Sequence, residues 1–209
     1  MKVVKLFGVH GSGKTTTGEM LKKYGFEYVK VDPMDGPLVR RVVNFSYRLG
    51  FIGSLLRQFM FVYSTYAKLN KLDLSNEKNI VIDFSPAQTI PYTLYFVDNK
   101  YSRNFICKFA LINEEEIDKK LNSVGYEIYN ALFLVYDNNG LKKIKKRILS
   151  RKSRPENIRR EEARKEYITA INNGMKDMFN LLGQKRIVIN ASEESHIRLA
   201  KLLRKLYEL

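Results

Sequence analysis

The chain is poor in the residues that build disulfides, metal centres and membrane helices. Its single cysteine, Cys107, excludes an internal disulfide and a cysteine zinc cluster, and we expect a buried structural thiol. The two histidines, His10 and His196, lie far apart in the sequence, which argues against a histidine metal site or a nucleophile–base pair. No apolar run approaches the roughly 18 residues of a membrane helix. The sequence therefore favours a cytoplasmic protein with no membrane partner.

Acidic residues are also few, since 22 Asp and Glu stand against 37 Lys and Arg and leave a net charge of +15. The excess is concentrated in residues 142–165, which hold twelve basic and three acidic side chains. Such a segment is either a solvated helix face or a surface that contacts phosphate groups, and both interpretations stay open. With 44% hydrophobic and 28% charged residues, the composition is that of a globular protein, and residues 1–209 are expected to form one domain.

The most specific motif lies near the N-terminus, where residues 8–15 read GVHGSGKT and match the phosphate-loop pattern G-x-x-x-x-G-K-[S/T]. Glycines let such a loop curl so that backbone N–H groups point at phosphates, and the following helix adds its positive end. Lys14 is expected on the β and γ phosphates and the Thr15 hydroxyl on Mg²⁺. The sequence therefore predicts that a nucleoside triphosphate is bound. The donor-binding residues are expected to be Gly8, Gly11, Ser12, Gly13, Lys14, Thr15 and Thr16.

Short apolar runs alternate with longer helical stretches, which is typical of a parallel sheet wrapped by crossover helices. This pattern predicts a three-layer α/β domain with a five-stranded sheet, whose ligands bind at the carboxyl ends of the strands. The strands are predicted at Val3–Phe7, Phe26–Val31, Asn79–Asp83, Ala131–Tyr136 and Arg186–Asn190. The helices are predicted at Lys14–Lys23, Leu38–Phe45, Gly53–Lys71, Gln88–Phe96, Glu114–Asn122, Leu141–Leu149, Glu156–Leu182 and Glu193–Tyr207.

Aspartates stand at the ends of three predicted strands: Asp32, Asp83 and Asp137. Because the carboxyl ends of parallel strands meet at one edge of a sheet, we expect these carboxylates near the phosphate loop. One can serve Mg²⁺ through water, and another can orient or deprotonate an attacking hydroxyl or phosphate. A strand-end aspartate is also common as a turn residue or helix cap, so that alternative stays open.

The order of several short motifs resembles the thymidylate kinase and deoxynucleoside kinase superfamily of P-loop phosphotransferases. The resemblance extends thinly over most of the chain, and only the phosphate loop is specific by itself. The matching pieces are the loop residues 11–16, Asp32-Pro33 after the second strand, Asp83-Phe84-Ser85 after the third, residues 147–151 before a long helix containing Tyr167, and residues 187–192 at the last strand.

The resemblance implies a P-loop kinase fold with a basic helical lid at about 142–165. It also implies transfer of a phosphoryl group from ATP, with Mg²⁺, to a nucleoside monophosphate or deoxynucleoside, and a thymidylate kinase-like activity is the first expectation. The implied catalytic residues are Lys14, Asp32, Asp83, Arg147 and Arg151. Thr15 and Asp83 are implied for the metal, Arg154 and Ala191 for the donor nucleotide, and Asp32, Gln58 and Ser85 for the acceptor.

The phosphate loop has no arginine at its variable positions, Val9 and His10. Phosphoryl transfer needs cations against the charge of the migrating group, so arginines of the basic segment are candidates for this role. These are Arg147, Arg151 and Arg154, for which a solvated position is the alternative.

Two departures from the family pattern argue against thymidine monophosphate as the acceptor. Phe84 stands where the family has an arginine, and Thr65 stands where a second arginine is expected. Either another arginine reaches an acceptor phosphate, or the acceptor is a free nucleoside; the candidates are Arg40, Arg41 and Arg57. A nucleic-acid-associated P-loop ATPase and a nucleotide-binding relative without kinase activity are the other functional interpretations. A homodimer is one assembly that the sequence leaves open.

Overall fold

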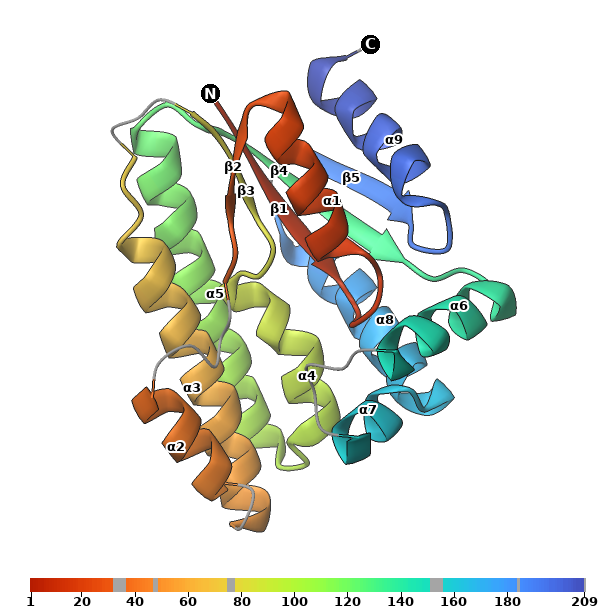
Figure 1. Ribbon diagram of the computed structural model, residues 1–209. Coiled ribbons are helices and arrows are strands. Elements are labelled where there is room, and N and C mark those ends of the chain that lie inside the picture. The colour runs from red at the N-terminus through yellow and green to blue at the C-terminus, as the bar shows by residue number, and fades with distance from the viewer. Residues whose placement is uncertain (32–36, 47–48, 75–77, 151–155, 184, 209) are drawn as a thin grey trace.

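The strands are apolar along most of their length because the sheet is covered on both faces. In the computed structural model, the spatial order is β2-β3-β1-β4-β5 and every pairing is parallel (Figure 1). The structure describes residues 1–31, 37–46, 49–74, 78–150, 156–183 and 185–208. The strands are β1 (Lys2–Gly8), β2 (Phe26–Val29), β3 (Asn79–Ile82), β4 (Glu127–Leu134) and β5 (Lys185–Asn190).

Helices lie on both faces of this sheet, so the predicted three-layer α/β fold is confirmed. Helices α1 and α9 cover one face, and α5 and α8 cover the other (Figure 1). The α-helices are α1 (Lys14–Leu21), α2 (Pro37–Ser46), α3 (Gly50–Asn70), α4 (Thr89–Phe96), α5 (Lys100–Ser123), α6 (Asn138–Leu149), α7 (Glu156–Glu162), α8 (Lys165–Leu181) and α9 (Ser195–Tyr207). Two 3₁₀ turns are η1 (Lys22–Tyr24) and η2 (Pro86–Gln88).

Two helices differ most from their predicted bounds, and the ends of the others differ by up to three residues. Helix α5 begins at Lys100 because the Asn99 side chain caps it, accepting a hydrogen bond of 3.0 Å from the Ser102 amide. The single helix predicted over 156–182 is divided into α7 and α8, since the backbone at Arg164 is extended, with φ −66° and ψ 139°. Because of this division, α7 and α8 point in different directions, as Figure 1 shows.

A buried charged group lies among these apolar layers. Lys5, in the middle of β1, is 1% exposed, and its Nζ contacts the carboxylates of Glu114 and Asp118 on α5. Burial alone would lower the pKa of Lys5, but the two carboxylates outweigh it and raise that pKa. The other Glu114 oxygen accepts a hydrogen bond of 2.8 Å from the Ala87 amide. We call Lys5, Glu114 and Asp118 the Lys5 cluster; it joins β1, α5 and the start of η2.

The single cysteine is less enclosed than the buried thiol that the sequence predicted. Cys107 lies on α5 and is half-buried, and burial raises the pKa of its thiol, which keeps the thiol protonated. Among the residues that the structure describes, none of the helices combines the length and apolar character needed to span a bilayer.

Candidate active site

The phosphate loop connects β1 to α1 in a shape that its glycines permit. Gly11 and Gly13 have φ values of 80° and 95°, in the left-handed region that side chains disfavour. A Cβ atom on Gly13 would lie 2.4 Å from Nη2 of Arg198, so a side chain there would collide as well. The loop is closed by a 3.2 Å hydrogen bond from the Ser12 amide to the Val9 carbonyl.

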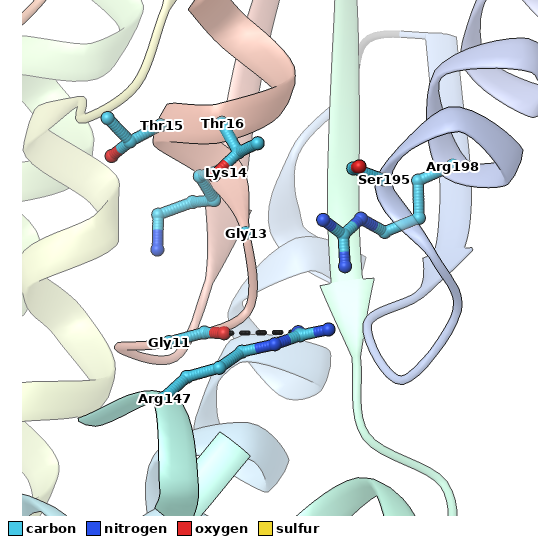
Figure 2. Close-up of a pocket in the computed structure, with 8 residues that line it drawn as sticks. All are labelled: Gly11, Gly13, Lys14, Thr15, Thr16, Arg147, Ser195 and Arg198. Atoms are coloured by element: carbon cyan, nitrogen blue, oxygen red, sulfur yellow. Dashed lines mark hydrogen bonds between the residues drawn. The ribbon is translucent and has the colours of Figure 1, made fainter. Parts of the chain in front are cut away.

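Lys14 folds back over the start of its own loop. Its Nζ donates to the carbonyls of Gly8, at 2.5 Å, and Val9, at 3.3 Å. The loop and two other segments enclose a cavity of about 340 Å³ (Figure 2). The cavity is lined by Gly11, Gly13, Lys14, Thr15, Thr16, Arg147, Ser195 and Arg198. It therefore combines five of the predicted donor-binding residues with cations from α6 and α9, whereas Gly8, Ser12 and Ala191 do not line it.

Arg147, predicted from the basic segment, reaches this cavity from α6. Its Nη1 donates to the Gly11 carbonyl at 3.4 Å and to the Ala191 carbonyl at 3.0 Å. One guanidinium thus joins the phosphate loop to the segment after β5, as Figure 2 shows for its contact with Gly11. The expected proximity of Arg147, the loop and Ala191 is present, and their catalytic roles stay predictions.

Arg198, on α9, lines the cavity and was not predicted from the sequence. It is 2% exposed, and its Nη1 donates to the carbonyls of Ala191, at 3.1 Å, and Glu193, at 2.9 Å. Burial and the neighbouring Arg147 lower the pKa of Arg198 to about 10, against the opposing effect of Glu193. A signal was available, because Arg198 directly precedes Leu199 on the buried face of an amphipathic helix.

Asp83 directly follows β3 and is buried. One carboxylate oxygen accepts a 2.9 Å hydrogen bond from the Val31 amide, and the other accepts one of 2.5 Å from the Tyr28 hydroxyl. Burial and this bond to Asp83 raise the pKa of Tyr28, while a hydrogen bond with Thr15 opposes the shift. Tyr28 thus contacts both side chains that were predicted to serve Mg²⁺.

Of the other two strand-end aspartates, the structure describes only Asp137. Asp137 is exposed and caps α6, accepting a 2.5 Å hydrogen bond from the Gly140 amide. This is the helix-cap alternative for Asp137, and it explains the residue without a metal. Asp32 lies outside the described residues, as do Arg151 and Arg154 of the basic segment.

Uncharged polar side chains are buried beyond the end of β3. Gln58 and Thr65 come from α3, Ser85 precedes η2, and Gln88 ends it; α3 and η2 are in contact. One side-chain oxygen of each has no hydrogen-bond partner among the described residues, although buried polar groups are normally paired. Gln88 donates through Nε2 to the Gly8 carbonyl at 3.2 Å, the same oxygen that Lys14 contacts. The buried polar group therefore extends to the phosphate loop.

Most described side chains of the basic segment face solvent. Arg160 pairs with Glu156 on α7, and Arg164, between α7 and α8, pairs with Glu161 three residues earlier. On α6 the lysines Lys142, Lys143, Lys145 and Lys146 are exposed. A solvated helix face thus explains much of the local charge, and Arg147 is the member that turns toward the loop.

The chain is similar to solved structures of deoxyadenosine kinase from M. mycoides. One, with products dCMP and a flexible dCDP bound, has 19% identity, a TM-score of 0.65 and coverage of 99% of this chain and 100% of that chain. Another, with bound dCTP, has 18% identity, a TM-score of 0.66 and coverage of 99% and 100%. A third, with bound dATP, has 18% identity, a TM-score of 0.66 and coverage of 98% and 99%. The chain therefore has the fold of these P-loop kinases, as the resemblance implied. The sequence matches no family model and no curated protein.

Proposed function

We propose that this protein is a kinase that transfers the γ-phosphoryl group of ATP to a deoxynucleoside. The observation that carries the proposal is the Gly8 carbonyl, which accepts hydrogen bonds from both Lys14 and Gln88. Lys14 is the phosphate-loop lysine, and Gln88 belongs to the buried uncharged polar group. A donor-phosphate site and a polar, uncharged acceptor site are thereby adjacent, which is the arrangement that phosphoryl transfer requires.

The donor half of the site supplies positive charge in a fixed position. Backbone N–H groups of the loop and the start of α1 can bind the triphosphate, with Lys14 on its β and γ phosphates. Mg²⁺ fits the oxygens of Thr15 and Asp83, both within contact of the Tyr28 hydroxyl. When bound there, the ion neutralises charge on the β and γ phosphate oxygens. Among the described residues no group of three His, Cys, Asp or Glu could hold a metal, which suits an ion held largely by phosphates and water.

The acceptor half supports a nucleoside without a phosphate. Phe84 packs against the apolar core and offers no hydrogen bond to an anion. Arg57, one candidate for an acceptor phosphate, donates instead to Ser54, at 2.8 Å, and Ser46, at 3.4 Å. Arg41 is exposed on α2. The unpaired oxygens of the buried polar group instead match the N–H and O–H donors of a nucleoside.

The reaction moves one phosphoryl group and one proton. An acceptor hydroxyl oxygen forms a bond to the γ-phosphorus, the bond from that phosphorus to the β–γ bridging oxygen breaks, and ADP leaves. Asp32 is proposed to orient the hydroxyl and receive its proton. The lid at about 142–165, including Arg147 and Arg151, is proposed to supply charge to the migrating group and to exclude water, which would otherwise hydrolyse ATP.

A coupled assay of ADP release tests the proposal. Deoxynucleosides and nucleoside monophosphates, the latter including thymidine monophosphate, are each supplied with ATP and Mg²⁺. We expect turnover with at least one deoxynucleoside, and turnover only with monophosphates would show that a basic residue replaces the missing arginine. Solved structures of similar fold that carry dCMP, dCDP, dCTP or dATP are named as deoxyadenosine kinases, which makes deoxyadenosine and deoxycytidine the first acceptors to try.

A nucleic-acid-associated ATPase is the second candidate, and the exposed lysines of α6 favour it. If these lysines follow a phosphate backbone, affinity for DNA or RNA falls with salt, with a log–log slope of roughly 0.9 per phosphate on duplex DNA. ATP hydrolysis stimulated by nucleic acid and by no small acceptor would favour this candidate over the kinase.

A further inference from the structure

The cavity at the phosphate loop contains two arginines and has no matching carboxylate. Within the described part of the chain, neither Arg147 nor Arg198 forms an ion pair. Glu193 is the acidic residue that acts on Arg198, and its carboxylate pairs with Lys201. The chain therefore keeps two like charges near each other, with Arg198 buried and Arg147 partly buried, an arrangement that an anion would stabilise.

Two backbone carbonyls orient the Arg198 side chain toward the phosphate loop. The carbonyls of Ala191 and Glu193 hold Nη1, which leaves Nη2 against Gly13 at the start of α1. Its buried Nε has no hydrogen-bond partner among the described residues. Figure 2 shows the guanidinium extending from α9 toward Gly13, on the side of the loop away from Thr15. Donor groups of an almost fully buried side chain thus face a cavity built to hold phosphate.

We propose that Arg198 is a phosphate-binding residue of the donor site. It binds the triphosphate from the α9 side, while Lys14 binds it from the opposite side and Arg147 approaches from α6. The inference rests on the proposed donor function and adds to it a cation fixed on the last helix. Because the guanidinium is fixed before the ligand arrives, it contributes to ground-state binding of the phosphates rather than to closure of the lid.

Calorimetric titration with two probes tests this role. Inorganic tripolyphosphate carries the phosphates alone, and ATP adds the ribose and base; both are titrated with Mg²⁺ into the full chain. We expect Arg198→Met to weaken both probes by the same factor, about tenfold to a hundredfold. Lys205→Met removes an equal charge from an exposed position of α9 and is the matched control, expected to change neither affinity by more than about twofold.

The conservative variant separates charge from structural support. Arg198→Lys keeps the positive charge and loses the two hydrogen bonds that Nη1 donates to the carbonyls of Ala191 and Glu193. We expect it to retain more tripolyphosphate affinity than Arg198→Met. Unchanged tripolyphosphate affinity in Arg198→Met would overturn the inference, and so would equal losses in both variants together with a lowered melting temperature. A wild-type chain that binds neither ATP nor tripolyphosphate would instead contradict the proposed function itself.

Discussion

Among the described residues, two basic side chains are buried, Lys5 and Arg198, and their surroundings are opposite in charge. In the Lys5 cluster, two carboxylates contact one ammonium group, and the pKa of Lys5 is raised despite complete burial. At the phosphate loop, Arg147 and Arg198 lie together, and burial lowers the pKa of Arg198 to about 10. A charge neutralised inside the chain supports structure, whereas a charge left without a counterion inside the chain is suited to an external anion.

Breaking the neutralised site should cost the most stability. Lys5→Met leaves Glu114 and Asp118 without their cation, and losing one partner of a buried pair costs about 3–5 kcal/mol. Urea unfolding should show a lower midpoint with an unchanged slope. Glu114→Gln is the companion variant, because it also weakens the bond that holds the Ala87 amide. A stability equal to that of wild type in both would contradict the structural role of the cluster.

Removing the loop lysine should abolish function and leave the fold intact. Lys14→Ala takes away the cation expected on the β and γ phosphates, and we expect turnover to fall by roughly 10²–10³-fold with weaker ATP binding. Steady-state kinetics and a melting curve check the two halves of this prediction. Normal ATP affinity and turnover in a folded variant would exclude the donor assignment.

A substitution of Arg147 tests whether the arginines at the phosphate loop, which have no carboxylate partner among the described residues, act in the reaction. If it stabilises charge that develops in the transition state, Arg147→Met lowers kcat by about tenfold or more and changes ATP affinity less. Its loss from a site crowded with positive charge should leave stability close to that of wild type. Equal effects on kcat and on affinity would assign Arg147 to ground-state binding, alongside Arg198.

The smallest effect is expected from substitutions of the strand-end aspartates, whose surroundings also differ. Asp137 is already used as the cap of α6, whereas Asp83 lies against Tyr28 beside Thr15. Asp83→Asn should raise the Mg²⁺ concentration needed for half-maximal turnover severalfold. Asp137→Asn preserves a capping side chain and should leave this concentration unchanged. The reverse pattern would place the metal role at Asp137.

The sheet could be predicted because each strand contains a short run of apolar residues, although β4 begins at Glu127 and not at the predicted Ala131. Helix α5 was predicted only from Glu114 because its first half places Tyr101 and Phe105 in solvent, which obscures the amphipathic pattern. The break at Arg164 was missed because neither proline nor glycine marks it.

The candidate site could be predicted where a local motif encodes it, as at Gly8 to Thr15. Arg198 and Gln88 come from segments without such a motif. They contact the loop only because the tertiary fold brings those segments next to it. Their roles depend on contacts between residues distant in the sequence, such as Gln88 with Gly8, which periodicity does not report. Only the tertiary structure shows these contacts.

The shared Gly8 carbonyl makes the two halves of the site energetically dependent on each other. When a phosphate draws Lys14 away, Gln88 keeps its hydrogen bond to an oxygen that has lost a competing donor. Donor occupancy would then alter the position of Gln88, which belongs to the proposed acceptor half. By thermodynamic linkage, the factor by which ATP changes acceptor affinity must equal the factor by which the acceptor changes ATP affinity. A single backbone oxygen would thereby couple the affinities of the two substrates by one factor, whichever of them binds first.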